Sequence, residues 1–245
     1  DYFKKEALVD EYTESLFLED AQKIVKKIRE YSCTELADVL KVSSSLASLN
    51  FQRYKEWSLP YTKPRGKQAI YAYRGDVYEG LDVDTFTKEE ILRLQSQVRI
   101  LSGLYGVIKP LDLILPYRLE MSTQLEVGGS NDLYDFWGNK LTKALIEECK
   151  SQNHHVLLNL ASQEYSSSIQ FKEIPAKVIS PVFKDHTSTG LKIVSFHAKR
   201  ARGLMTRFVI KNGIKHPDEL KAFDSEGYSY NEEMSEKSKG LVFIR

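Results

Sequence analysis

Apolar residues recur at helical spacing in the first part of the chain. Between Ala21 and Ile28 they occupy one face of a helix, while lysine and arginine residues occupy the other, which predicts an amphipathic helix. Thr34 and then Ser43 or Ser44 are candidate N-caps of two further helices, because a hydroxyl accepts a hydrogen bond from the first helical turn. The N-terminal third is therefore expected to be mostly helical.

The middle of the chain carries both strand and helix patterns. Residues 69–73 predict a short strand that runs into a turn. Thr87 and Glu90 have the spacing of a capping box, which predicts a helix that ends at Gly103. Asn131 is a candidate N-cap for another long helix with a regular apolar face.

Strand patterns are frequent in the last third. The apolar run 156–161 predicts a buried strand, and residues 177–183 and 191–196 predict two strands joined as a β-hairpin. A helix is expected over 198–211, and a last strand over 241–244.

Composition indicates an ordinary globular protein. Hydrophobic residues make up 42% and charged residues 28% of the chain, which excludes a disordered polyelectrolyte. Without repeats or a linker, we predict one domain over residues 1–245 with a mixed α/β (α+β) fold, in which a mixed β-sheet is flanked by helices. No apolar run approaches the roughly 20 residues that span a bilayer, and no signal-peptide core is present, so we expect a cytoplasmic protein without a membrane partner.

Charge is balanced overall but segregated in one place. The 35 lysine and arginine residues face 34 aspartate and glutamate residues, so an acidic partner would have to be bound by a local cluster. The segment 195–211 contains no carboxylate, and on a wheel of 100° per residue its apolar side chains gather opposite its cations. These cations are Lys199, Arg200, Arg202, Arg207 and Lys211.

Gly203 lies in the middle of this cationic face. Because glycine costs a helix interior about 1 kcal/mol relative to alanine, its presence indicates the close approach of another group. A phosphate held between arginine side chains is one such group. The alternative is a basic face that pairs with carboxylates elsewhere in the fold, with Gly203 serving tight helix packing.

A second candidate phosphate site lies in the segment from Arg99 to Pro110. A helix there is expected to run into a turn bracketed by Gly103 and Gly106, which resembles a helix-hairpin-helix. In that motif, backbone N–H groups hold a DNA phosphate without reading the sequence. The alternative is a helix C-cap followed by a tight turn.

Carboxylates near strand ends suggest a different chemistry. Alternation after Pro116 places Arg118 and Glu120 on one face, either as an internal ion pair or as part of an anion or acid–base site shared with Glu164. Asn159 and Ser162 follow a predicted strand and are candidates for the same site, although Ser162 is also a good helix N-cap.

Other site chemistry is not indicated. The five histidines lack ligand-spaced partners, and Cys33 and Cys149 match neither a redox pair nor a metal-ligand spacing. The known nucleotide-binding and nucleophile-elbow motifs are not found. We therefore predict no metal site, no cofactor and no catalytic residue.

Several stretches together resemble the YaaA family of bacterial peroxide-stress proteins. The matching stretches occur in the same order along most of the chain. They are Gly75–Tyr78, Leu101–Val107, Pro110–Leu113, Pro116–Met121, Asn159–Ser162 with Glu164 and Tyr165, and Ala198–Met205 with Arg207.

The resemblance implies a bacterial cytoplasmic protein that limits damage by hydrogen peroxide, is associated with lower free intracellular iron, and binds DNA through a helix-hairpin-helix and a positively charged cleft. Carried onto this sequence, it assigns DNA contacts to Ser102, Gly103, Gly106, Lys109, Arg118, Lys199, Arg200, Arg202, Gly203 and Arg207. The short N-terminal strand usual in the family, which ends Ser-Pro-Ala-Lys-Thr, is not found in this sequence, and because residue 1 is Asp rather than Met we expect it to be missing.

We therefore predict largely sequence-independent binding to duplex, single-stranded or structured DNA, with a preference for distorted or branched forms. Tyr105 or Tyr117 would stack on an unpaired base. One alternative is an enzyme that acts on a nucleotide or phosphate-bearing metabolite with Arg118, Glu120 and Glu164 in its site, and another is direct iron sequestration by carboxylates. No protein partner can be inferred.

Overall fold

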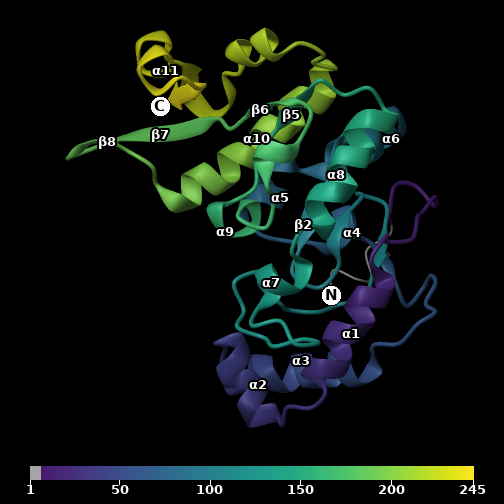
Figure 1. Cartoon of the computed structure of the whole chain (residues 1–245). Helices are drawn as coiled ribbons and strands as arrows, with labels where there is room; N and C mark the ends of the chain where they lie inside the picture. The colour runs from purple at the N-terminus through teal and green to yellow at the C-terminus, as the bar shows by residue number, and fades with distance from the viewer. Residues whose placement is uncertain (1–6) are drawn as a thin grey trace. The chain divides into compact units, whose positions relative to one another are not determined.

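The computed structural model describes residues 7–245, and the chain divides into two compact units. The first unit consists of Asp1–Ala72, Gln95–Leu145 and Gln163–Gln170, and the second of Tyr73–Leu94, Ile146–Ser162 and Phe171–Arg245. Helices and short strands occur in both (Figure 1), which confirms the mixed α/β class. One domain over residues 1–245 stays a prediction.

Three helices begin the described part of the first unit: α1 (Leu18–Ile28), α2 (Cys33–Leu40) and α3 (Ser44–Glu56). The apolar face of α1 is buried, as the helical spacing predicts. Ser43 caps α3 as expected, but α2 begins two residues earlier than predicted, because Ser32 and not Thr34 is its N-cap and forms a capping box with Glu35.

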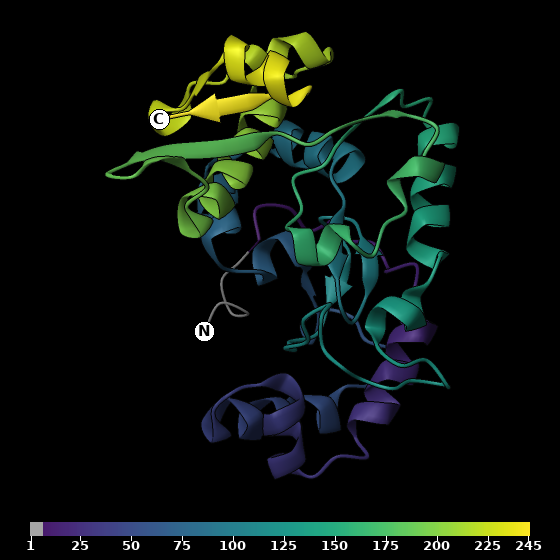
Figure 2. The ribbon, with the colours of Figure 1, turned by 60° about the vertical axis from the view of Figure 1, so that its left-hand side comes forward.

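Helices α2 and α3 form a helical hairpin, visible in Figure 1 and Figure 2. Residues 41–43 alone separate them. Lys41 ends α2 in the left-handed conformation, with φ 53°, and its N–H donates to carbonyls of the last turn of α2. Ser43 then accepts a hydrogen bond from the Leu46 N–H, which starts α3.

Short strands and helices complete the first unit. β1 pairs with β4 and β2 pairs with β3, both antiparallel. The bounds are β1 (Lys67–Gln68), α4 (Ala69–Ala72), β2 (Ile100–Ser102), β3 (Gly106–Ile108), β4 (Leu113–Ile114), α7 (Leu133–Trp137) and α9 (Gln163–Ser166), while α6 (Lys88–Gln97) and α8 (Lys140–Ser151) continue from one unit into the other.

Aromatic side chains hold the core of the first unit together. Trp57 Nε1 donates to the Tyr105 hydroxyl at 2.9 Å, and that hydroxyl also accepts the Leu115 N–H at 3.0 Å. Trp137 Nε1 donates to the Gly103 carbonyl at 3.0 Å. Each buried polar atom of these rings thus has a partner, as burial requires.

The second unit is built on a four-stranded sheet in the order β8-β7-β10-β9. β7 pairs in parallel with β10 and antiparallel with β8, and β10 pairs antiparallel with β9. The bounds are β7 (Val182–Thr187), β8 (Gly190–Lys192), β9 (Ser229–Tyr230) and β10 (Val242–Ile244), with β5 (Val156–Leu158) and β6 (Lys177–Ile179) forming a separate parallel pair.

Helix α10 (Ser195–Asn212) packs on this sheet and against α5 (Asp76–Leu81). Its buried residues join Phe183 and Phe243 of the sheet in one apolar cluster with Phe223 and Tyr228. The remaining elements of the unit are α11 (Glu232–Ser238) and the 3-10 turns η2 (Val83–Thr85), η3 (Phe171–Glu173), η4 (Pro217–Ala222) and η5 (Ser225–Gly227).

The predicted helix-hairpin-helix at residues 102–109 is wrong, because this segment is a β-hairpin. The capping box of Thr87 and Glu90 forms as predicted, but α6 ends at Gln97 and the chain becomes extended. Ser102 Oγ accepts the N–H groups of Leu104 and Tyr105, and Gly106, with φ 70°, reverses the chain. The glycine turn therefore connects two strands.

Other predicted elements differ in type or extent. Residues 69–73 do not form the predicted strand, because Ala69–Ala72 are the short helix α4, in which Ala69, Ile70 and Tyr71 are buried. The long helix after Asn131 is capped by Asp132 and broken at Gly138, which has φ 46°.

The predicted hairpin of 177–183 and 191–196 is also wrong in the bounds of its two strands. β7 and β8 form it over 182–192, and Ser195 already begins α10. The strands predicted over 156–161 and 241–244 are confirmed in shorter form, although the first is not buried as predicted. The helix predicted over 198–211 is confirmed and is longer, since it begins at Ser195 and ends at Asn212. Among the described residues, no helix is long and apolar enough to cross a membrane.

Candidate functional site

Helix α10 carries the densest group of predicted site residues. Its buried residues are Ala198, Ala201, Gly203, Leu204, Met205 and Ile210, so the apolar face predicted from the wheel is confirmed. The cations lie outside this face, but they do not share one environment. Three of them are bound by other parts of the second unit, and two are not.

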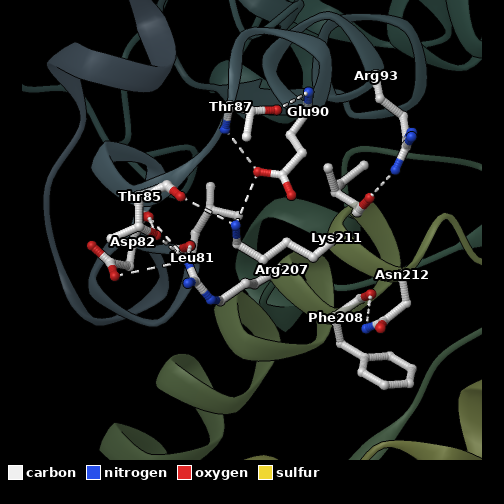
Figure 3. Close-up of polar contacts among 11 residues, drawn as sticks. Leu81, Asp82, Thr85, Thr87, Glu90, Arg93, Arg207, Phe208, Lys211 and Asn212 are labelled. Atoms are coloured by element: carbon white, nitrogen blue, oxygen red, sulfur yellow. Dashed lines mark hydrogen bonds and ion pairs between the residues drawn. The ribbon is translucent and has the colours of Figure 1, made fainter. Parts of the chain in front are cut away.

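Arg207 and Lys211 clamp the segment between α5 and α6 (Figure 3). Arg207 Nη1 donates to the carbonyls of Leu81 and Asp82 at 3.1 and 3.0 Å and to Thr85 Oγ1 at 2.6 Å. Lys211 Nζ donates to the Thr85 carbonyl at 3.1 Å and to Glu90 at 2.9 Å, which holds the pKa of that carboxyl below its usual range.

Arg200 also has a partner within the second unit, the carboxylate of Glu226. Its Nε and Nη2 donate to the carboxylate of Glu226 at 2.8 and 2.6 Å, and this fork lowers the pKa of Glu226. Behind it, buried Asp185 accepts from Arg245 Nε at 2.6 Å and lies 3.1 Å from His197 Nδ1. Arg200, Arg207 and Lys211 therefore fit the structural alternative, that of cations paired within the fold.

Gly203 serves the contact between α10 and α5. A Cβ at Gly203 would overlap the Val77 carbonyl oxygen, and a Cβ at Gly80 would overlap the Arg200 carbonyl oxygen. The two helices cross where both lack a side chain. Gly203 is thus enclosed by protein, and its predicted contact with a phosphate is wrong in this structure.

Lys199 and Arg202 are the two cations of α10 with no ion pair or hydrogen bond among the described residues. Lys199 is exposed. Arg202 is partly buried, and burial alone lowers its pKa because no acceptor faces the guanidinium. A desolvated guanidinium without a partner is favourable for an incoming anion, since part of the desolvation cost is already met by the fold.

Most of the predicted hairpin residues are enclosed by the first unit, while a DNA contact by the partly buried Lys109 side chain stays a prediction. Ser102, Gly103 and Gly106 are buried, and Ser102 Oγ also bonds the Tyr117 hydroxyl at 2.5 Å. The Lys109 N–H donates to Asp112 at 2.8 Å. The backbone N–H groups that were expected to hold a phosphate are thus used inside the first unit.

The first unit does bring Arg118, Glu120 and Glu164 close to one ring, that of Tyr165. Arg118 Nη2 donates to Glu120 at 2.9 Å, and both side chains are about half exposed. Glu164 accepts from the N–H and Oγ of Ser122 at 3.1 and 3.0 Å. Burial first, then the two carboxylates, raises the pKa of Tyr165 to about 12.

Asn159 and Ser162 belong to the second unit. The Asn159 amide nitrogen donates to Ser180 Oγ at 3.1 Å, and its oxygen accepts the Ala161 N–H at 3.2 Å. Ser162 directly precedes α9. Their predicted place beside Glu120 and Glu164 stays a prediction.

Sequence reasoning missed the exposed start of α3. Ser43, Ser44 and Ser45 are exposed, the first turn contains no carboxylate, and the exposed Lys41 precedes it. A helix N-terminus of this kind favours an anion. The signal was the short link between two capped helices, which distinguishes a helical hairpin from two separate helices.

No group of three or more histidine, cysteine, aspartate or glutamate side chains is placed to hold a metal ion within residues 7–245.

Comparison with known proteins identifies a family and several similar chains. The model of a family described as peroxide stress protein YaaA matches residues 1–234. A UPF0246 protein of Shewanella sp. (strain ANA-3) is 45% identical over 99% of this chain and 94% of its own length. UPF0246 proteins of Aliivibrio fischeri (strain ATCC 700601 / ES114) and Dechloromonas aromatica (strain RCB) are 46% and 45% identical, over 96% and 99% of this chain and 90% and 94% of their own lengths.

Proposed function

Since this chain belongs to the peroxide stress protein YaaA family, we propose that it acts in the peroxide-stress response by binding the phosphate backbone of DNA. The observation that carries the proposal is the pair of unpartnered cations on α10, Lys199 and Arg202. They are one helical turn apart, so their side chains are neighbours on the helix surface.

The spacing of these two cations suits a phosphate backbone. Arg202 offers a planar fork of donors, and Lys199 offers a mobile point charge on the same side of the helix. Neither group can read a base edge through a phosphate contact, so binding is expected to be largely independent of sequence. Because Arg200 and Arg207 already have partners, we expect fewer phosphate contacts from α10 than its charge suggests.

The helical hairpin α2–α3 supports a second phosphate contact. Lys41 and the exposed start of α3, where Ser43 caps the Leu46 N–H, provide donors of the kind that a helix-hairpin-helix uses. The family resemblance implies such a motif, and in this chain we assign it to residues 33–56 rather than 99–110. Lower free iron in the cell belongs to this proposal as an expected consequence of the response.

The test is fluorescence anisotropy with a labelled 30-base-pair duplex over a salt series. We expect the Lys199→Gln/Arg202→Gln variant to lower affinity and to reduce the slope of log affinity against log salt by about 2, because each phosphate contact contributes about 0.9. Lys177→Gln/Lys215→Gln removes two exposed, unpaired cations of the same unit and is the matched control. Equal slopes in the two variants would reject α10 as a phosphate-binding surface.

A second candidate function is catalysis at Glu120 and Glu164. It is favoured by the two carboxylates that lie near Tyr165, with Arg118 as an anion-binding group. We expect Glu120→Gln to leave DNA affinity unchanged. Turnover of a phosphate-bearing metabolite that this variant abolishes would support the enzyme over the DNA-binding protein.

A further inference from the structure

The start of α10 exposes an aromatic side chain beside unpaired cations. Phe196 is 54% exposed, and Ile193, immediately before the helix, is 58% exposed. On the helical wheel Phe196 lies 180° from the buried Met205, so the helix directs it away from the core of the second unit. The two residues form an apolar surface that the described fold does not cover.

Cations flank this surface on both sides. Lys192 ends the edge strand β8, and Lys199 follows Phe196 by three positions, which places it next to the ring on α10. Both lysines are exposed, and neither has an ion pair among residues 7–245. No aspartate or glutamate occurs between Gly190 and Arg202, so the surface is suited to an anionic partner with an apolar face.

The first turn of α10 is also unusually open. Its N-cap is Val194, which provides no side-chain hydrogen bond, and the turn contains no carboxylate. The His197 Nδ1 lies 3.1 Å from Oδ1 of buried Asp185 without forming a hydrogen bond, and the His197 ring lies 5.6 Å from the Phe196 ring. The residue next to Phe196 therefore lies against the second unit, while Phe196 itself is exposed.

We infer that the Phe196 surface, formed by Lys192, Ile193, Phe196 and Lys199, binds an unpaired nucleic-acid base, which stacks on the Phe196 ring while the two lysines contact the adjoining phosphates. An aromatic face between cations is the arrangement that binds single-stranded nucleic acid, because every base offers a flat face to stack on. Because the ring can stack on any base, the surface is expected to recognise unpaired bases whatever their sequence.

This inference rests on the proposed DNA binding and narrows its ligand to nucleic acid with an unstacked base. The sequence predicts that Tyr105 stacks on such a base, but its side chain is fully buried and its hydroxyl accepts two hydrogen bonds within the core. Tyr117 is partly buried, and its hydroxyl is bonded to Ser102. Phe196 takes the role that the sequence assigned to these tyrosines.

The test compares three ligands that share one length and sequence: a fully paired 30-base-pair duplex, the same duplex with a three-nucleotide bulge, and the same bulge built from abasic sites. We expect the protein to bind the bulge with bases at least about fivefold more tightly than the abasic bulge, since one stacked base corresponds to about 1 kcal/mol or more. Phe196→Leu keeps an apolar side chain but lacks the ring, and it should lose this preference while binding the paired duplex as before.

Two further variants make the test specific. Phe196→Trp should keep the preference, and the bulge with bases should quench part of its tryptophan emission. Trp57 and Trp137 also fluoresce, but both are buried, so the emission of the natural protein should not change. Leu92→Ala removes an exposed apolar side chain elsewhere in the second unit and should change nothing.

Failure of the inference is distinguishable from failure of the proposed function. Duplex binding with no difference between the bulges, or a preference unchanged in Phe196→Leu, would overturn the inference alone. No binding to any of the three ligands would overturn the proposed function as well. Phe196-dependent binding to vesicles containing phosphatidylserine, without a preference for the bulge with bases, would assign the surface to a membrane and reject the nucleic-acid inference.

Discussion

Single residues on α10 differ in what a ligand would have to displace. The guanidinium of Arg207 already donates hydrogen bonds to two backbone carbonyls and a hydroxyl. If it turned to a phosphate instead, these acceptors would lose their donor. Lys199 and Arg202 have no such partner, and a phosphate adds hydrogen bonds without removing any. At this scale, the paired cations stabilise the fold and the unpaired ones are available for binding.

Gly203→Ala tests how closely α10 and α5 approach. Alanine in an open helix position would stabilise the helix by about 1 kcal/mol relative to glycine, but here its Cβ overlaps the Val77 carbonyl oxygen. We expect a loss of roughly 3 kcal/mol or more in the free energy of unfolding, measured by urea denaturation. Gly240→Ala, which has nothing within 4 Å of its added Cβ, is the control. Similar midpoints for the two variants would contradict the close crossing.

The Arg200–Glu226 pair gives the stability a pH dependence. Because Arg200 lowers the pKa of Glu226 in the folded protein below its unfolded value of about 4.3, the pair stabilises the fold above that pH. This stabilisation is lost as the pH falls through the lowered folded value. The urea midpoint of the natural protein should therefore fall more steeply below about pH 4.3 than that of Glu226→Gln, and parallel curves would refute the pairing. Glu147→Gln, at an exposed position of the same unit, should follow the natural protein.

At the scale of elements, side chains of α10 bind the segment that joins α5 to α6. Arg207 and Lys211 reach Leu81 to Glu90 from the helix, and Arg93 returns a hydrogen bond to the Ile210 carbonyl at 2.5 Å. The other hydrogen bonds of its backbone are local, such as those from the N–H groups of Thr85 and Phe86 to carbonyls three residues earlier. Its order is therefore expected to depend on these side chains.

Arg207→Ala should loosen that segment before it affects the sheet. We expect the free energy of unfolding to fall by about 1 to 2 kcal/mol, since partly buried acceptors lose their donor. Amide hydrogen exchange should rise within residues 81–87, while exchange in β7 and β10 should stay close to that of the natural protein. A uniform rise across the second unit would show that Arg207 supports the whole fold and not this segment.

How far the sequence predicts these elements depends on the range of the contacts that form them. Local signals predicted α1, the Ser43 cap and the Thr87–Glu90 capping box correctly, because those partners lie within four residues. The helical wheel of α10 was also correct. The partners of its cations could not be predicted from local patterns. Glu226 is 26 residues from Arg200, and Leu81, whose carbonyl binds Arg207, is 126 residues from it.

The candidate site was predicted only in part for the same reason. The glycines at 103 and 106 were read as a phosphate-binding turn, but the structure uses them to reverse a buried strand. Phe196 was placed in a strand, which hid its position on the outer side of α10. The alternation that suggested the strand ends where Ser195 begins the helix.

For the whole molecule, the family match spans both compact units, so both belong to the unit of function. The chain is nearly neutral, with 35 lysine and arginine residues against 34 aspartate and glutamate residues. The proposed binding to DNA would therefore depend on local groups of cations, with an affinity that is sensitive to salt. The proposed contacts lie on α10 and on the α2–α3 hairpin, one in each unit.

The most direct measurement of this account is lysine footprinting of the whole chain, with acetylation quantified by mass spectrometry with and without DNA. We expect bound DNA to protect Lys199, Lys192 and Lys41, while Lys177 and Lys215 keep their reactivity as internal controls. Unchanged reactivity at both Lys199 and Lys41 under conditions where DNA is bound would contradict the central claim that these surfaces hold the phosphate backbone.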